Sequence, residues 1–199
     1  MNLAPSTLKK IGAGLAVVLL ALMLARFAVH SYGRAITNSN SGEGDQGAFL
    51  QLGLDLREHG TLTDGTRNPL YAAVLAVLAH REWDYFTQAK LASMAFGLLT
   101  IVAVFVLGWR YFNPFTGIVA AWLVSINVEF VVHSATALTE SLLVLLFTLA
   151  WFAMLRALDR PDRWGIWALA GVLTALAYLA KGSGQLLGYA FLLTGLLLY

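Results

Sequence analysis

The stretch LASMAFGLLTIVAVFVLGW, residues Leu91–Trp109, decides the fold because it contains no charged side chain. A transmembrane helix needs about 20 mostly apolar residues to cross the hydrocarbon core of a bilayer. Similar apolar runs precede and follow it, at Ile11–Val29, Phe115–Val132, Ala135–Leu155, Trp164–Ala180 and Leu186–Tyr199. We therefore predict an all-α, polytopic bundle of about six transmembrane helices, with residues 1–199 forming a single membrane domain. The last run reaches the end of the chain, so we expect the N-terminal part of a longer protein.

The composition excludes an ordinary soluble domain. The chain has 199 residues, of which 59% are hydrophobic and 12% charged, and its mean hydropathy is +0.71. Soluble domains average about 45–50% apolar and about 25% charged residues. A net charge of +2 is too small for a nucleic-acid-binding surface, so we expect no nucleic acid partner. The absence of cysteine excludes disulfides and thiolate chemistry.

Basic residues predict the orientation of the helices. Lys9 and Lys10 precede the first apolar run, and cytoplasmic loops are enriched in lysine and arginine, so a cytoplasmic N-terminus is favoured. Alternation of the spans then places four arginines on the same side, Arg110, Arg156, Arg160 and Arg163. We expect the long segment 30–85 and the turns near 133–140 and 181–185 on the extracytoplasmic side.

Segment 30–85 is too apolar to be a simple linker. QGAFLQLGLDLREHG, residues 46–60, places leucines and a phenylalanine ahead of a charged end, and Gly60 can terminate a helix there. NPLYAAVLAVLAH, residues 68–80, is apolar but too short to span a bilayer. We predict two short amphipathic helices that lie at the membrane surface, covering about 47–59 and 68–80.

Glu43 and Asp45 form a pair of carboxylates in a glycine-flanked turn just beyond the first span. Two carboxylates at this spacing can approach a metal ion, or one can accept a proton from a substrate hydroxyl. The alternative is a solvated acidic loop without chemistry.

Ionisable groups also occur where the later spans meet this side. A helix would place Glu129 and His133 on one face, and Glu140 opens the next span. Such groups at membrane depth indicate a functional site, although Glu140 also suits a helix N-terminus and His133 can merely cap a turn. Lys181 begins a glycine-rich turn and can hold a phosphate as a point charge, or simply extend to the headgroups. Because their predicted depths agree, we expect Asp45, His133, Glu140 and Lys181 to line one cavity.

The sequence segments described above occur in an order that resembles a known protein family. EGDQGAFLQLGLDLREHG and NPLY are followed by GWRYFNP, then NVEFVVHSATALTESLLVLLF, then GVLTALAYLAKGSGQLL. This series resembles the N-terminal half of the GT-C-type membrane glycosyltransferases, in particular the bacterial group of protein O-mannosyltransferase-like and aminoarabinose-transferase-like enzymes. The resemblance covers about residues 10–195. The first loop differs from the family in reading Glu-Gly-Asp-Gln instead of two adjacent acids.

The resemblance implies a bacterial inner (plasma) membrane enzyme that moves a sugar from a polyprenyl-phosphate carrier to an extracytoplasmic acceptor. The acceptor class, whether glycan, lipid or protein, stays open. Asp45 corresponds to the proposed catalytic base, Glu140 to the acid at the start of the fourth span, and Lys181 to the lysine that holds the carrier phosphate. Arg67 and Tyr71 join Glu43 and His133 as further substrate-binding candidates. A divalent metal ion is a candidate cofactor, with Asp45 and Glu140 as candidate ligands.

Two other classes remain open on the residues alone. Intramembrane ionisable groups also mark transport paths, so a transporter or channel half is the first alternative. A non-catalytic membrane scaffold is the second.

Overall fold

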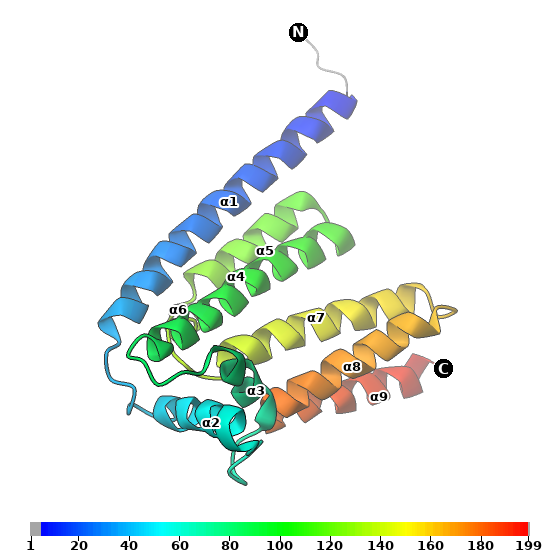
Figure 1. Cartoon of the computed structure of the whole chain (residues 1–199). Coiled ribbons are helices and arrows are strands. Elements are labelled where there is room, and N and C mark those ends of the chain that lie inside the picture. Colours follow the sequence, from blue (N-terminus) through cyan, green and yellow to red (C-terminus); the bar gives the residue numbers. More distant parts are fainter. Residues whose placement is uncertain (1–4, 199) are drawn as a thin grey trace.

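The computed structural model describes residues 5–198, and within them it contains helices and no strands (Figure 1). In chain order the helices are α1 (Pro5–Thr37), α2 (Gln46–His59), α3 (Pro69–Leu78), α4 (Tyr85–Tyr111), α5 (Pro114–Ile126), α6 (Val128–His133), α7 (Glu140–Asp159), α8 (Trp164–Ala180), the 3-10 turn η1 (Gly182–Gly184) and α9 (Gln185–Leu198). The predicted all-α bundle is confirmed.

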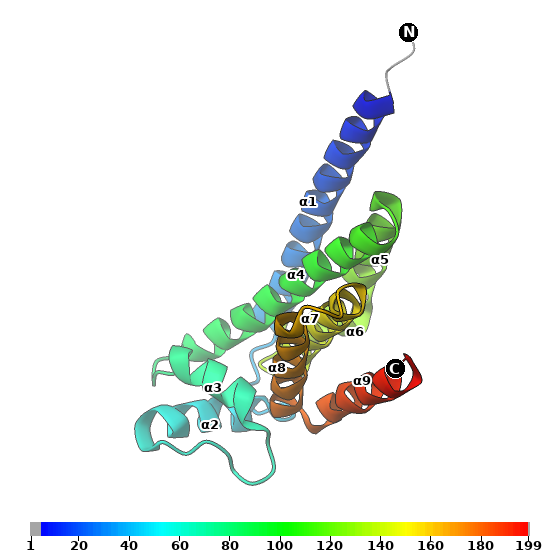
Figure 2. The ribbon, with the colours of Figure 1, turned by 90° about the vertical axis from the view of Figure 1, so that its right-hand side faces the viewer.

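The long helices alternate in direction along the bundle. Helices α1, α4, α5, α7, α8 and α9 run back and forth, so their connections fall at two ends (Figures 1 and 2). One end carries the connection 38–84 with α2 and α3, together with segments 127–139 and 181–184; we call it the loop end. The opposite end carries the short connections 112–113 and 160–163. This alternation agrees with about six predicted spans.

Within the part of the chain that the structure describes, three helices are long and apolar enough to cross a membrane, α1, α4 and α7. Helices α5, α8 and α9 are apolar but shorter. The prediction of a continuous third span over 115–132 was wrong, because the helix stops at Asn127. The Asn127 side chain accepts a hydrogen bond from the Phe130 amide and thereby starts α6. The fourth span begins at Glu140 and not at Ala135, since residues 134–139 form turns.

The two helices predicted for segment 30–85 are confirmed as α2 and α3. Gly60 ends α2 in the left-handed conformation, with φ of 74°, and its amide donates to the Leu56 carbonyl. The two helices pack against each other and against α4. Phe49 and Tyr71 meet edge to face at 5.3 Å between ring centroids, and a Cβ on Gly53 would lie 2.9 Å from Leu75 Cβ. The apolar faces of α2 and α3 are thus buried within the protein.

Two apolar clusters hold the bundle together. One joins α2 and α3 to α4, α7 and α8 through residues such as Tyr71, Leu75 and Leu142. The other joins α1 to α4 and α5 around Phe27 and Ile101. The first cluster lies directly beneath the loop end, so it supports the ends of the helices that carry the candidate functional residues.

Candidate functional site

A cavity of about 140 Å³ opens at the loop end, where four segments far apart in sequence meet. Its charged lining residues are Asp45, Arg67, Glu140 and Lys181, and the remainder are Phe49, Thr66, Asn68, Leu138, Thr139 and Ala180. We call it the charged cavity. Asp45, Glu140 and Lys181 were expected to share a cavity, and the structure brings these three together.

Asp45 stands at the N-terminus of α2 and is largely exposed. Gly44 before it has φ of 59°, a conformation that glycine adopts without strain, and so turns the chain into the helix. One carboxylate oxygen, Oδ1, lies 2.6 Å from Arg67 Nη2. The carboxylate is therefore held at the rim of the charged cavity while remaining open to solvent.

Arg67 joins two carboxylates from different loops. Its guanidinium pairs with Asp45 and with Asp64, and it lies 5.8 Å from the centre of the Phe49 ring. Both carboxylates raise the pKa of Arg67, and the hydrogen bond that Arg67 donates to Asp45 is the larger cause. Asp64 in turn accepts 2.9 Å hydrogen bonds from the amides of Thr66 and Arg67, and these bonds hold its pKa well below the usual value.

Glu140 and Lys181 form the opposite wall of the charged cavity. Lys181 Nζ donates to Glu140 Oε1 at 2.7 Å. Glu140 is the first residue of α7, where the helix dipole favours a negative charge. Its Oε2 is buried and has no hydrogen-bond partner among residues 5–198. The Thr139 hydroxyl donates to the Ala180 carbonyl at 2.9 Å and ties the start of α7 to the end of α8. This bond sets the separation of the two charged residues.

Gln46, which the sequence did not single out, organises the turn that carries Asp45. Its side chain is 2% exposed. Its Oε1 accepts from Asn38 Nδ2 and from the Ala137 amide, both at 3.0 Å, and its Nε2 donates to the carbonyls of Glu43 and Asn40. One buried amide thus connects the turn before α2 to the segment before α7.

Lys90 is a second residue that sequence reasoning missed. It lies on α4, is 3% exposed, and donates to the carbonyls of Ala35 and Asn38 at 2.6 Å. Ala35 lies in the last turn of α1 and Asn38 directly follows the helix, so the cation complements the negative end of the helix dipole. Because α4 begins at Tyr85, Lys90 lies inside the helix and does not mark its start; its place beside the apolar run Leu91–Trp109 was the available signal for a buried cation.

His133 and Glu43 do not line the charged cavity. They lie on a neighbouring cavity of about 460 Å³, so the expectation that His133 shares a cavity with Asp45 was wrong. His133 ends α6 and Glu140 begins α7, and the turns at residues 134–139 separate the two side chains along the chain. Tyr71 is fully buried, and its hydroxyl lies 2.9 Å from Ser93 Oγ, so it has no surface that a substrate could touch. It supports the site from beneath through its contact with Phe49.

The candidate metal ligands Asp45 and Glu140 are each already paired with a cation. A metal ion there would have to displace Arg67 or Lys181 or lie beside them, so these residues fit a metal poorly. Among the described residues, a group of three metal-ligating side chains that lies within 4.8 Å is found instead at His80, Glu82 and Asp84, before α4.

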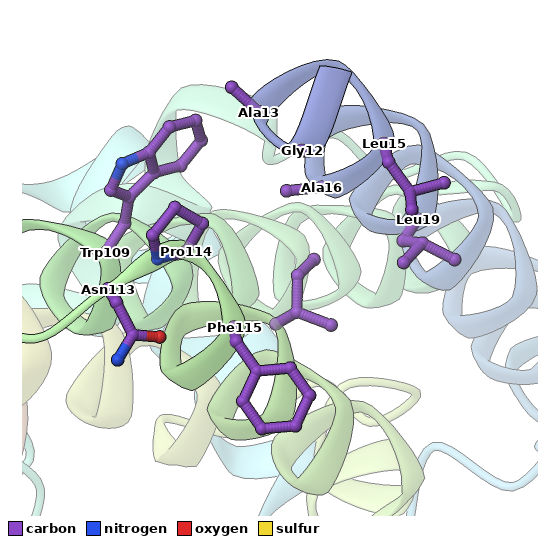
Figure 3. A pocket seen from close by; sticks show the side chains of 10 residues that line it. Gly12, Ala13, Leu15, Ala16, Leu19, Trp109, Asn113, Pro114 and Phe115 are labelled. Atoms are coloured by element: carbon purple, nitrogen blue, oxygen red, sulfur yellow. The ribbon is translucent and has the colours of Figure 1, made fainter. Parts of the chain in front are cut away.

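A larger cavity, of about 680 Å³, lies at the opposite end between α1 and the α4–α5 turn (Figure 3). Its lining residues are Gly12, Ala13, Leu15, Ala16, Leu19, Trp109, Asn113, Pro114, Phe115 and Ile118. None of them can carry a charge at neutral pH. This cavity therefore offers no charged group for chemistry, and volume alone does not identify the site.

Comparison with known proteins identifies a protein family that the chain matches. Residues 67–199 match a family model described as dolichyl-phosphate-mannose-protein mannosyltransferase. The matched range contains Arg67, Glu140 and Lys181, whereas Asp45 precedes it. No curated protein and no solved structure matches the chain.

Proposed function

Because the chain belongs to the dolichyl-phosphate-mannose-protein mannosyltransferase family, membrane glycosyltransferases of the GT-C type, we propose that it takes a sugar from a polyprenyl-phosphate carrier. In this proposal the sugar passes to an acceptor on the extracytoplasmic side of a bacterial inner membrane. The observation that carries the proposal is the meeting of Asp45, Arg67, Glu140 and Lys181 around one cavity at the end of an apolar bundle. A lipid carrier confines its phosphate to the headgroup layer, so its binding groups must lie at one depth.

Lys181 and Arg67 are the groups that hold the carrier phosphate. An ammonium acts on phosphate as a point charge, and a guanidinium can bind two of its oxygens at once. Each cation is now paired with a carboxylate, Lys181 with Glu140 and Arg67 with Asp45. An arriving phosphate competes for both cations. Arg67 keeps Asp64 as a partner, so Asp45 is the carboxylate that is released.

The released Asp45 serves as the general base. The bond between the sugar carbon and the phosphate oxygen breaks, and its electron pair leaves with the phosphate. The acceptor oxygen forms the new bond to that carbon, and its proton passes to Asp45. Lys181 and Arg67 stabilise the charge that develops on the leaving phosphate. A single displacement of this kind inverts the configuration at the sugar carbon.

Charge distribution supports the proposed orientation. Arg110 and Arg156 lie in the last turns of α4 and α7, and Arg160 and Arg163 follow α7. All four are at the end opposite the charged cavity, where α1 also begins. Basic residues favour the cytoplasmic side. The loop end, with its acids, is accordingly the extracytoplasmic side.

The transporter alternative is less well supported. A transport path places ionisable groups along the depth of a bundle. Here Asp45, Arg67, Glu140 and Lys181 gather at one end.

The proposal is tested with the chain in lipid nanodiscs and a polyprenyl-phosphate hexose labelled in the sugar. Labelled sugar should be transferred to acceptor or to water, and the carbon should be inverted. Transport of the intact labelled lipid without cleavage of the sugar–phosphate bond would contradict the proposal.

A further inference from the structure

The second cavity at the loop end is separated from the charged cavity by the turn that carries Asp45. It has a volume of about 460 Å³, within the usual range for small-molecule sites of about 300–1,000 Å³. Gly44 and Gln46 line it, whereas Asp45 between them lines the charged cavity, and Leu138 is shared by both. The two cavities therefore flank one turn. We call the larger one the polar cavity.

Two polar atoms at the polar cavity are buried and have no partner among the described residues, His133 Nδ1 and Asn38 Oδ1. Asn38 is fixed in place, because its Nδ2 donates to Gln46 Oε1 and its carbonyl accepts from Lys90. Its Oδ1 is thus held without a donor. Buried polar atoms of this kind are costly unless paired. Both atoms are covered in this structure, and a turn of the His133 side chain toward the cavity lets a ligand pair its ring nitrogen and recover part of that cost.

The charges at the polar cavity cancel. Arg34 contributes one positive and Glu43 one negative charge, and both line the cavity. The other polar side chains are neutral hydroxyls and amides, including those of Thr37 and Thr136. A phosphate offers mainly acceptor oxygens, which Glu43 and Asn38 Oδ1 would repel. A hydroxyl both donates and accepts, so a ligand with several hydroxyls satisfies this mixed set.

We propose that the polar cavity binds the acceptor and that this acceptor is a neutral, hydroxyl-rich molecule, a sugar or polyol. The inference rests on the proposed function, since it assigns the second substrate of the same reaction. The carrier phosphate occupies the charged cavity, and the body of the acceptor occupies the polar cavity. The reacting hydroxyl of the acceptor extends past the turn between them to Asp45, whose carboxylate lines the charged cavity. Val132, Ala135 and Leu138 supply apolar surface for the C–H faces of a sugar ring.

The absence of cysteine from the chain allows each cavity to carry a single reactive thiol. Thr136→Cys and Thr37→Cys report on the polar cavity, from its wall and its exposed rim, and Thr66→Cys reports on the charged cavity. The rate of N-ethylmaleimide labelling is measured in nanodiscs with D-glucose, myo-inositol, inorganic phosphate or N-acetylserinamide. The polyols should slow labelling of both polar-cavity thiols and leave Thr66→Cys unaffected. Inorganic phosphate should do the reverse.

A histidine pair tests the contact itself. In the Thr136→Cys background, His133→Ala should raise the polyol concentration for half-protection about tenfold, the usual worth of one buried hydrogen bond with its unpaired partner. His80→Ala, which removes a histidine outside the polar cavity, should leave that concentration unchanged.

Each arm can fail separately. Protection of the polar-cavity thiols by phosphate, or by N-acetylserinamide alone, would overturn a neutral polyol acceptor while leaving the donor site intact. If the polyols protected the Thr136→Cys thiol equally well with and without His133→Ala, the proposal of a neutral polyol acceptor would also be overturned. Failure of phosphate to protect Thr66→Cys would instead count against the proposed function.

Discussion

Asp45 Oδ1 and Arg67 Nη2 lie 2.6 Å apart and join the turn before α2 to the loop before α3. Arg67 also pairs with Asp64, so one guanidinium holds both a carboxylate of the charged cavity and its own loop. This relationship gives Asp45 a fixed direction and a partner that a phosphate can take over. It also explains how an exposed aspartate can be positioned without being buried.

Lys181→Met should weaken binding of the donor phosphate by about 10- to 100-fold, because it removes a charge-assisted hydrogen bond and keeps most of the apolar stem. Binding of a labelled polyprenyl-phosphate hexose to nanodiscs measures this directly. Lys181→Arg is the matched control and should retain most of the affinity. Equal affinity of Lys181→Met and the wild type would remove Lys181 from the donor site.

Gln46→Leu should lower the free energy of unfolding by about 2–3 kcal/mol, because it leaves Asn38 Nδ2 and the Ala137 amide buried without an acceptor. Denaturation in mixed micelles measures the change. Gln51→Leu, on the exposed side of the same helix, should change it by less than about 0.5 kcal/mol. If the two substitutions proved equally mild, Gln46 would not be the organiser of the turn.

The stability of the loop that holds Arg67 should change with pH only under acidic conditions. Asp64 has a lowered pKa in the folded chain, so its stabilising effect is complete above the usual aspartate value and is lost as the pH falls below about 4. Hydrogen exchange of the Thr66 and Arg67 amides, corrected for intrinsic rates, should therefore stay constant from pH 8 to 5 and accelerate below. Asp64→Ala should show fast exchange at every pH. Loss of protection between pH 7 and 5 in the wild type would contradict this account.

The helical fold could largely be predicted from the length of the apolar runs. Leu91–Trp109 and the other apolar runs of similar length are compatible with few structures other than transmembrane helices. The two helices after residue 45 were also predictable, from Gly60 and Pro69 as their limits. The break at Asn127 was not. A capping asparagine inside an apolar run looks like a tolerated polar residue until the Phe130 amide is seen to bond to it.

The charged cavity was predictable in part. Asp45, Glu140 and Lys181 were predicted to share a cavity because all three lie at the ends of spans on one side of the membrane. An equal depth in the membrane does not determine where around the bundle axis a residue lies. The same reasoning therefore also included His133, which in the structure lines the polar cavity. The role of Gln46 could not be predicted from the sequence. Three of its partners lie in the turn just before it, residues 38–43, but the fourth, the Ala137 amide, comes from a segment that only the fold brings near.

The most direct test of the central claim is the turnover of Asp45→Asn against that of Glu43→Gln, with a polyprenyl-phosphate hexose as donor. Asp45→Asn keeps the shape of the side chain but removes the proton acceptor. Turnover should fall by about 10²–10⁴-fold, the usual worth of a positioned base, while donor binding persists. Glu43→Gln, equally acidic but on the polar cavity, should reduce turnover much less. Wild-type turnover of Asp45→Asn, or a greater loss in Glu43→Gln, would contradict the assignment of Asp45 as the base.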